Sequence, residues 1–382
     1  MTTNPCTDRQ LTEFRRYLHT IPEVAMQEVN TAKAVEHFLS VLRPNELLGG
    51  VGGTGVVAIW KGASPGPVVM LRAELDALPI TEINTFAHRS LKKEVSHKCG
   101  HDGHTTILLG VARELHEQPP SKGSVVLLFQ PGEETGEGAP AVLADERFQA
   151  IRPECVFALH NLPGYPLGAV VIKEGGFTAA VKSLIIRLHG KTSHAAEPEH
   201  GHNPALAIAE ILQLETTLSK PLLDDPHFFL ITPVYVTMGD QAYGISAGYG
   251  EVHLTVRSWS EEVMEAAADR LLEAIRDIVS KHKLELETEW THVFRANIND
   301  GECLEKVRRA ATECGNECIA RNTPFKWGED FGCFTQEFPG VMFGLGAGEN
   351  CPALHNPDYD FPDELLDHGI KLMTSVVRQL NG

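Results

Sequence analysis

The pattern of apolar and polar positions in the first part of the chain predicts strands that alternate with helices. Apolar residues recur at helical spacing over residues 8–42, with one interruption at Pro22, and again over residues 105–117. Short apolar runs rich in β-branched residues predict buried strands at 55–60, 68–71, 124–130 and 156–159. This order is typical of an α/β fold in which a mixed, mostly parallel sheet carries helices on both faces.

The pattern changes after Gly176 and predicts a second, smaller domain. Two helices are expected, at 203–218 and 260–282, and four strands are expected at 181–189, 228–238, 251–259 and 284–290. The order β-α-β-β-α-β is that of a ferredoxin-like α+β domain. Residues 291–382 return to helix and buried strand. We therefore predict a discontinuous domain, residues 1–177 and 291–382, that is interrupted by an inserted domain at 178–290.

Length and composition restrict the kinds of partner. A chain of 382 residues is long for one core, and its 42% hydrophobic and 22% charged residues are ordinary for a globular protein. The formal net charge of −18 argues against nucleic acid or an anionic membrane as a partner. No apolar run approaches the roughly 20 residues needed to span a bilayer.

The first residues and the cysteine usage favour a cytoplasmic location. Residues 1–8 contain neither the basic flank nor the apolar core of a signal peptide. The eight cysteines are scattered along the chain instead of forming a disulfide framework, which fits a reducing compartment.

One short segment carries the densest chemistry in the sequence. Cys99, His101 and His104 supply a thiol and two imidazoles, and Asp102 adds a carboxylate. Sulfur and imidazole nitrogen two residues apart suit zinc or a similar divalent transition metal. The positive end of the following helix, together with Lys98, would favour the thiolate. The alternative is a buried cysteine beside a loop histidine, and His104 is either a supporting partner or an ordinary helix residue.

Two adjacent glutamates, Glu133 and Glu134, follow the predicted strand at 124–130. Adjacent residues in extended chain point to opposite sides, so one carboxylate can bind metal while the other takes a proton from bound water. The alternative is a solvated acidic turn, because the chain contains 51 acidic residues.

Other candidate ligands also follow predicted strands. Asp76 comes after the strand at 68–71 and His160 after the strand at 156–159, and such strand ends meet at the edge of a parallel sheet where ligands bind. A lone histidine is more often a hydrogen-bonded core residue, so His160 and His355 become candidates only together with the cysteine cluster. Asp76 either bridges metal ions, orients a ligand imidazole or belongs to an ordinary turn.

Together these segments resemble the M20 family of metallopeptidases and amidohydrolases. The resemblance runs nearly end to end and is closest to the branch of N-acyl amino acid amidohydrolases, which includes hippurate and auxin-conjugate hydrolases. The segments that carry it are 15–23, 77–79, 99–104, 130–134, 190–196, 328–331 and 354–357. The cysteine cluster combined with the glutamate pair is its most specific part.

The resemblance implies a site with two divalent metal ions, Mn²⁺ or Zn²⁺. Its implied metal ligands are Cys99, His101, Glu134, His160 and His355. Glu133 is then the general base, and Asp76 is a further catalytic candidate.

The resemblance also assigns roles to the inserted domain at 178–290, which would be a lid and dimerisation domain beside the catalytic one. His194 corresponds to the histidine that reaches the substrate carbonyl, often from the partner subunit of a dimer. Arg257 is a candidate for the substrate carboxylate, because a guanidinium binds a carboxylate through two parallel hydrogen bonds. We therefore expect a homodimer or a higher homo-oligomer.

Two positions depart from the pattern of this branch. Glu74 stands where aspartate is usual, and Gly244 stands where an asparagine often helps to hold the substrate. Residues 88–98 are unusually basic for so acidic a chain. They would attract an anionic substrate, although a solvated loop is the simpler interpretation.

The sequence therefore predicts metal-dependent hydrolysis of the amide bond of N-acyl amino acids or related small amide conjugates, with no nucleic acid or membrane partner. One alternative is a dipeptidase or carboxypeptidase of the same superfamily. Another is a non-catalytic metal-binding homologue, against which Glu133 argues, because a pure metal binder has no use for an unligated carboxylate beside the metal.

Overall fold

A computed structural model of the protein describes residues 7–382 and divides them into two compact units. Unit 1 comprises the described residues up to 177 together with 297–322 and 329–382, and unit 2 comprises 178–296 and 323–328. Most of the N-terminal segment that we compared with signal peptides, residues 1–6, lies outside the described residues. Among the helices of residues 7–382, none is both long and apolar enough to cross a bilayer.

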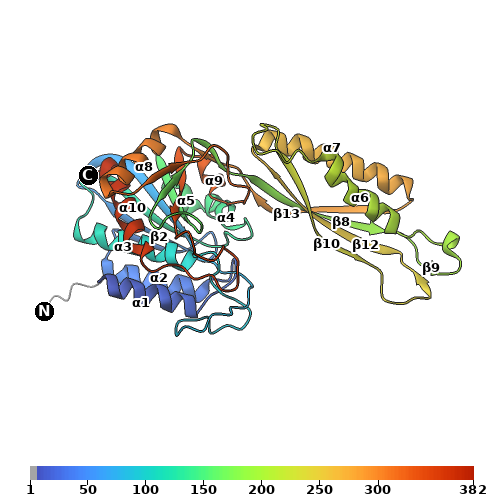
Figure 1. The fold of residues 1–382 in the computed structure, drawn as a ribbon. Helices are drawn as coiled ribbons and strands as arrows, with labels where there is room; N and C mark the ends of the chain where they lie inside the picture. Colours follow the sequence, from blue (N-terminus) through green and yellow to red (C-terminus); the bar gives the residue numbers. More distant parts are fainter. Residues whose placement is uncertain (1–6) are drawn as a thin grey trace. The chain divides into compact units, whose positions relative to one another are not determined.

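The centre of unit 1 is a mixed sheet with the strand order β1-β2-β4-β3-β5-β16-β6-β15 (Figure 1). The pairs β4-β3, β3-β5, β5-β16 and β6-β15 are parallel, whereas β1-β2, β2-β4 and β16-β6 are antiparallel. This confirms the mostly parallel sheet. Its strands are β1 (Glu46–Val51), β2 (Gly55–Lys61), β3 (Ser64–Glu74), β4 (Lys122–Gln130), β5 (Cys155–Leu162), β6 (Val170–Ile172), β15 (Cys318–Ala320) and β16 (Gly340–Gly346).

Helices cover both faces of this sheet. One face packs against α1 (Asp8–Thr20), α2 (Val29–Leu42), α3 (His101–Glu117), α8 (Gly301–Cys314) and α10 (Leu365–Asn381). The opposite face carries α4 (Gly138–Ala144), α5 (Glu146–Gln149) and α9 (Gly332–Thr335). A separate two-stranded sheet joins β7 (Gly175–Thr178) to β14 (Asn297–Asn299).

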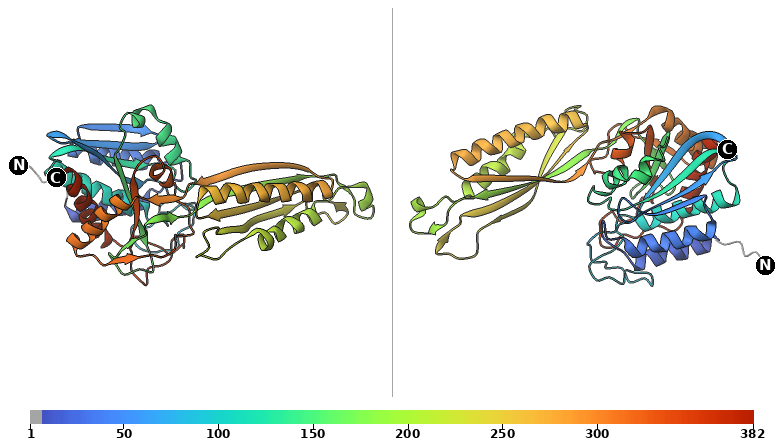
Figure 2. Two further views of the ribbon diagram at one scale, coloured as in Figure 1. Left: turned by 90° about the horizontal axis from the view of Figure 1, so that it is seen from above. Right: turned by 180° about the vertical axis from the view of Figure 1, so that it is seen from behind.

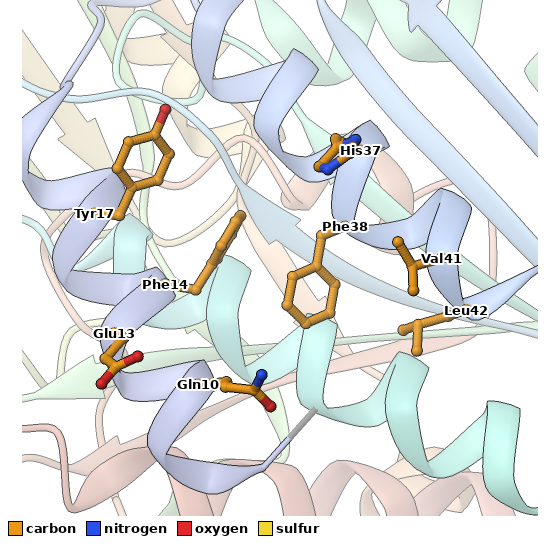
Figure 3. A pocket seen from close by; sticks show the side chains of 8 residues that line it. All are labelled: Gln10, Glu13, Phe14, Tyr17, His37, Phe38, Val41 and Leu42. Atoms are coloured by element: carbon orange, nitrogen blue, oxygen red, sulfur yellow. The ribbon is translucent and has the colours of Figure 1, made fainter. Parts of the chain in front are cut away.

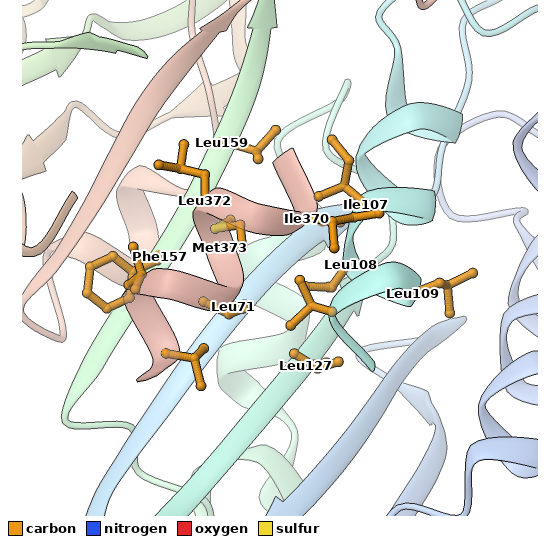
Figure 4. Packing of buried hydrophobic residues seen from close by; sticks show 14 of the residues in the cluster. Leu71, Ile107, Leu108, Leu109, Leu127, Phe157, Leu159, Ile370, Leu372 and Met373 are labelled. Carbon is orange, nitrogen blue, oxygen red and sulfur yellow. The ribbon is translucent and has the colours of Figure 1, made fainter. Parts of the chain in front are cut away.

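The main core of unit 1 fixes the strands from which the candidate site projects. Leu71 of β3, Leu127 of β4 and Phe157 of β5 lie against Leu108 of α3 and Met373 of α10 (Figure 4). Each of these side chains is almost completely buried, and burial of one such side chain contributes roughly 1.5–3 kcal/mol. The carboxyl ends of the strands, and the residues that follow them, are therefore held firmly.

The break in the N-terminal helix is longer than the single interruption expected at Pro22. Helix α1 ends at Thr20 and α2 begins only at Val29. The carboxylate of Glu23 accepts hydrogen bonds from the backbone N–H groups of Asn30 (2.8 Å) and Thr31 (2.9 Å), so it satisfies the otherwise unpaired start of α2. The contact between Glu23 and Asn30 joins residues seven apart in the chain, and the spacing of apolar residues alone does not reveal it.

Unit 2 has a four-stranded antiparallel sheet with the order β10-β12-β8-β13. Both helices pack on one face of it (Figure 2). This is the strand order of the ferredoxin-like fold. The elements of unit 2 are β8 (Ala180–His189), β9 (Ser193–His194), the 3-10 helix η1 (Pro198–His200), α6 (Ala205–Leu218), β10 (Phe229–Met238), β11 (Ile245–Ser246), β12 (Tyr249–Ser258), α7 (Glu261–Lys281) and β13 (Glu285–Phe294).

Candidate metal centre

The thiol of Cys99 lies at the start of α3, and a glycine places it there. Gly100 precedes the helix in a left-handed conformation (φ 96°), and a Cβ at this position would lie 2.1 Å from Nδ2 of Asn161. Helix α3 begins at His101, four residues earlier than the sequence pattern predicts. The pattern missed the first turn because it holds polar residues that are nevertheless buried, such as Asp102 and His104.

The structure brings the five candidate ligands of unit 1 together. Sγ of Cys99 lies 3.5 Å from Nε2 of His160. Potential ligand atoms of Cys99, His101 and His160 all lie within 4.8 Å of one another, as do those of Cys99, Glu134 and His355. Cys99 therefore stands between two groups of donors that come from four separate chain segments.

Two buried atoms in this cluster provide a test of whether a cation fits. Nε2 of His101 and Oε1 of Glu134 lie 4.0 Å apart, and neither has a hydrogen-bond partner among residues 7–382. Buried polar atoms are normally paired, and both atoms carry lone pairs that a divalent cation accepts. Thiolate, imidazole and carboxylate together are a donor set suited to a transition metal such as zinc. The residues present fit the implied metal.

The charge around these atoms also favours a cation. Burial and the nearby Asp76 raise the pKa of Glu134 to about 7, although His101 opposes this shift. Burial lowers the pKa of His101, but Asp76 and Glu74 outweigh it and raise this pKa to about 10. Both shifts reflect an excess of buried negative charge, which a bound divalent cation would neutralise.

Asp76 orients one candidate ligand and anchors another. Nδ1 of His101 donates to the backbone oxygen of Asp76 at 2.9 Å and lies 3.3 Å from its carboxylate, which turns Nε2 toward the cluster. The other carboxylate oxygen accepts the backbone N–H of Glu134 at 2.9 Å. Of the three alternatives considered for Asp76, these contacts favour the one in which it orients the imidazole of a candidate ligand.

His160 lies within strand β5 and not after its end, as the sequence pattern had placed it. The strand continues to Leu162 because Asn161 and Leu162 are buried and pair with β16. Nδ1 of His160 donates to the backbone oxygen of Asn161 at 2.9 Å, and burial lowers the pKa of the ring to about 3. The imidazole is therefore neutral, with Nε2 directed at Cys99.

Glu133 belongs to a second group of buried acidic side chains, which it forms with Glu329 and Asp330. Carboxylate oxygens of Glu133, Glu329 and Asp330 lie within 4.8 Å of one another, and Oε2 of Glu133 lies 3.9 Å from Nε2 of His101. Burial, followed by the charge of Glu329, raises the pKa of Glu133 well above its usual range. Sequence reasoning assigned no role to Glu329 or Asp330.

A buried arginine holds this second group in place. Arg72 donates to Glu329 (2.8 Å) and to Asp330 (2.7 Å), and it also pairs with Glu74. Arg72 is a charged residue in the buried half of β3, and that anomaly was the signal that could have identified it.

Glu74, which replaces the usual aspartate, bonds to His104. Nδ1 of His104 donates to Glu74 at 2.7 Å, and Nε2 accepts the backbone N–H of Asn161 at 3.1 Å. Both ring nitrogens are thus engaged, so His104 supports neighbouring segments and is not a free metal ligand.

The sequence predicted that Lys98 would stabilise the Cys99 thiolate, but its ammonium group has other partners. Its ammonium group donates to Glu82 (2.5 Å) and to the backbone oxygen of Tyr359 (2.7 Å). Burial, followed by the charge of Glu134, instead raises the pKa of the Cys99 thiol well above its usual range. Another member of the basic segment at 88–98 also has an acidic partner: Nε2 of His88 lies 3.1 Å from a carboxylate oxygen of Asp360.

Glu28 ties the loop that contains Gly132 to two other loops. Its buried carboxylate accepts hydrogen bonds from the backbone N–H groups of Gly132 (2.7 Å) and Met26 (2.8 Å) and from the hydroxyl of Thr54 (2.6 Å). Gly132 directly precedes Glu133, so this carboxylate fixes the approach of the chain to the glutamate pair. The spacing of the sequence gave no hint of this contact.

His194 and Arg257 belong to unit 2, whereas all the residues above belong to unit 1. His194 is exposed on β9, and its Nδ1 accepts the backbone N–H of Ala196 at 3.0 Å. Arg257 on β12 donates to the backbone oxygen of Lys326 at 2.7 Å. A Cβ at Gly244 would meet no heavy atom within 4 Å, so crowding next to the backbone does not require glycine at this position.

A separate surface hollow of unit 1 lies between α1 and α2 (Figure 3). Apolar side chains such as Phe14, Phe38 and Val41 line it, and the rings of Phe14 and Phe38 are 4.9 Å apart. None of the candidate metal ligands contributes to this hollow. This hollow is therefore separate from the candidate metal centre, which lies at the strand ends.

Known proteins are similar to this chain in sequence and in fold. The sequence model of Peptidase family M20/M25/M40 matches residues 70–379. An N-acetyl-L-cysteine deacetylase of Bacillus subtilis is 33% identical over 346 residues, which cover 89% of this chain and 81% of that protein. An N-acetyldiaminopimelate deacetylase of Priestia megaterium is 29% identical, with 96% of this chain and 97% of that protein covered.

Solved structures agree with this match. The YXEP protein of Bacillus subtilis, described as a dinuclear metal binding peptidase from the M20 family, superposes with a TM-score of 0.81 at 26% identity and covers 97% of this chain and 98% of its own. The aminobenzoyl-glutamate utilization protein of Klebsiella pneumoniae gives a TM-score of 0.74 at 19% identity, with 97% of this chain and 95% of that chain covered. The second likeness concerns the fold alone.

Proposed function

This chain belongs to Peptidase family M20/M25/M40, and from that premise we propose that it is a hydrolase that uses divalent metal to cleave the amide bond of N-acyl amino acids. Two relatives at 33% and 29% identity are named as deacetylases of N-acetylated amino acids, which supports this substrate class. The observation that carries the proposal is the buried carboxylate of Glu133, whose Oε2 lies 3.9 Å from Nε2 of His101, a candidate metal-binding imidazole.

We assign the metal-holding role to the donors that gather at the strand ends, and we propose two ions, Mn²⁺ or Zn²⁺. When bound there, divalent cations polarise a carbonyl oxygen and lower the pKa of a water molecule. The proposed ligands are Cys99, His101, Glu134, His160 and His355. Asp76 keeps Nε2 of His101 directed at the site through its contacts with Nδ1.

Glu133 is the proposed general base. Its carboxylate takes a proton from the attacking water and delivers it to the leaving amine. A base that must hold this proton between two steps works best when its pKa lies near the working pH. Burial and the charge of Glu329 raise the pKa of Glu133, which supports this role. Arg72 limits the repulsion among these acids by pairing with Glu329 and Asp330.

Unit 2 supplies the proposed substrate contacts. Because Nδ1 of His194 accepts a backbone N–H, a neutral ring carries its proton on Nε2 and can donate to the developing oxyanion. Arg257 uses one N–H on Lys326, and its guanidinium has further donors for a substrate carboxylate. We further propose that the inserted domain at 178–290 acts as a lid and dimerisation domain, in a cytoplasmic homodimer.

A substrate panel tests this function. The full-length protein, supplied with Mn²⁺ or Zn²⁺, is incubated with N-acetyl and N-benzoyl amino acids and with dipeptides, and release of free amine is measured. We expect the acylated amino acids to be hydrolysed fastest. Faster cleavage of dipeptides would favour the dipeptidase alternative, and metal binding without any turnover would favour the non-catalytic homologue.

A further inference from the structure

Two cysteines meet in unit 1 at the end of the central sheet that lies away from the candidate metal centre. Cys155 is the first residue of β5, and Cys303 lies in the first turn of α8. His160 is on the same strand as Cys155, and at about 3.3 Å per residue the two are separated by about 17 Å. This pair plays no part in the proposed hydrolysis.

The backbone places both cysteines beside the start of β16. The N–H of Val156, next to Cys155, donates to the oxygen of Pro339 at 3.0 Å. The N–H of Asp300 donates to the oxygen of Gly340 at 2.9 Å, and the Asp300 carboxylate in turn accepts the N–H of Cys303 at 2.9 Å. The first residue of β16, Gly340, and Pro339 just before it therefore anchor the two cysteine segments.

The two thiols contact each other and are not equivalent. Their side chains interact with each other, and both are free cysteines. Cys155 is half-buried, whereas Cys303 is 4% exposed. The interaction with Cys303 lowers the pKa of Cys155, and the same contact together with burial raises the pKa of Cys303. Cys155 is thus the accessible thiol that ionises first, and Cys303 is a buried neighbour.

We propose that Cys155 and Cys303 form an oxidisable thiol pair that hydrogen peroxide converts to an intramolecular disulfide. The Cys155 thiolate attacks one peroxide oxygen, the O–O bond breaks, and the hydroxide that leaves takes up a proton to become water. Cys155 is then a sulfenic acid. The sulfur of Cys303 attacks the Cys155 sulfur, the S–O bond breaks, and a second water molecule leaves with the thiol proton. Two thiols and one peroxide give one disulfide and two waters.

The disulfide would join the amino end of β5 to α8 across a long stretch of chain. Such a cross-link restricts the unfolded chain, so the oxidised protein unfolds at a higher temperature than the reduced one. The distance from His160 leaves the hydrolytic site unaffected. The proposal is independent of the substrate of the enzyme.

Peptide mapping without reduction tests the pair. The full-length, metal-loaded protein is treated with hydrogen peroxide, and we expect a cross-linked peptide that contains Cys155 and Cys303. Before oxidation, a haloacetamide should label Cys155 about tenfold faster than the exposed Cys318 at pH 7, because only the thiolate reacts. Cys318→Ser is the matched control and should leave the cross-link intact.

Two variants separate the roles of the thiols. Cys303→Ser should stop at the sulfenic acid on Cys155, which a cyclic 1,3-dione traps, and Cys155→Ser should leave Cys303 unmodified. Absence of the cross-link in the unsubstituted protein, or a Cys303 that still reacts in Cys155→Ser, would overturn the proposal. Unchanged far-ultraviolet circular dichroism of both variants shows that they fold.

Discussion

The backbone N–H of His355 donates to the carbonyl oxygen of Lys98 at 2.8 Å, so the last candidate ligand in the chain is tied to the residue before the first. His355 also adopts a left-handed conformation, with φ of 65°. Such a conformation costs a non-glycine residue about 1 kcal/mol. Together the hydrogen bond and the backbone direct the imidazole at Glu134, whose Oε1 lies 3.7 Å from Nε2.

At His355, two substitutions can separate the effect of losing the imidazole from the effect of the strained backbone conformation. We expect His355→Ala and His355→Gly to lose activity and bound metal equally, because both remove the imidazole. The glycine variant should nevertheless be more stable to urea than the alanine variant by about 1 kcal/mol, because glycine adopts positive φ without strain. Equal stabilities of the two variants would contradict the strained conformation.

Replacing Glu133 should separate metal binding from turnover. Glu133→Gln keeps the size of the side chain but removes the base, so we expect turnover to fall by a factor of about 100 or more. Metal content, measured by elemental analysis, should stay at the level of the unsubstituted protein. Full activity in this variant would rule out Glu133 as the base.

Loss of a proposed ligand should act on the metal itself. In Cys99→Ala and His160→Ala we expect bound metal after dialysis to fall, and activity to fall with it, since each change removes one donor from the cluster. His104→Gln is a useful comparison, because His104 bonds to protein groups through both nitrogens. If His104→Gln lost metal as fully as Cys99→Ala, the ligand assignment would need revision.

The Glu28 carboxylate should prove important for stability although it is not a ligand. Glu28→Ala leaves the buried N–H of Gly132 and the partly buried N–H of Met26 without their acceptor, and we expect a cost of about 1–3 kcal/mol for the buried group and less for the other. Glu28→Gln retains an accepting oxygen and should cost far less. Urea unfolding of the pair measures the difference, and similar losses in both would point to the charge instead of the acceptor.

The raised pKa of the buried His19 side chain allows a prediction of how the stability of the protein depends on pH. Burial lowers its pKa, but Asp102 and Glu82 outweigh burial and raise it from 6.5 to about 9. A raised pKa in the folded state gives stability that is fully present below pH 6.5 and is lost as the pH rises through about 9. We expect the free energy of unfolding to fall by about 1–3 kcal/mol across this interval.

The same interval distinguishes His19 from other groups. His19→Gln should be less stable below pH 6.5 and should show a flatter profile up to pH 9, since glutamine carries no titrating proton. A variant that kept the full slope would assign the pH dependence to another residue.

Much of the fold followed from hydrophobic periodicity, because buried strands such as β2 and β4 have long apolar runs that only a sheet interior accommodates. The approach of Glu134 to Asp76 followed from the rule that residues beyond the carboxyl ends of parallel strands meet at one edge of the sheet. The exact ends of elements did not follow. Asn161 extends β5 because its neighbours bury it, and burial is a property of the folded chain.

The supporting network was mostly invisible to the sequence because its partners lie far apart along the chain. Arg72 meets Glu329 and Asp330 only through the fold, at separations of 257 and 258 residues. The prediction that Lys98 acts on Cys99 was wrong for a related reason. The two residues are neighbours in the sequence, which suggested contact, but the buried ammonium group of Lys98 instead pairs with the carboxylate of Glu82.

The cramped surroundings of Gly100 have an evolutionary consequence. This position contributes no reactive group, yet any larger residue would collide with Asn161 and would also have to accept an unfavourable φ. A complete substitution scan should find it as intolerant as the cysteine beside it. Descendants of this protein can therefore vary the candidate metal ligands beside Gly100 only within a turn that has no room for a Cβ at that position.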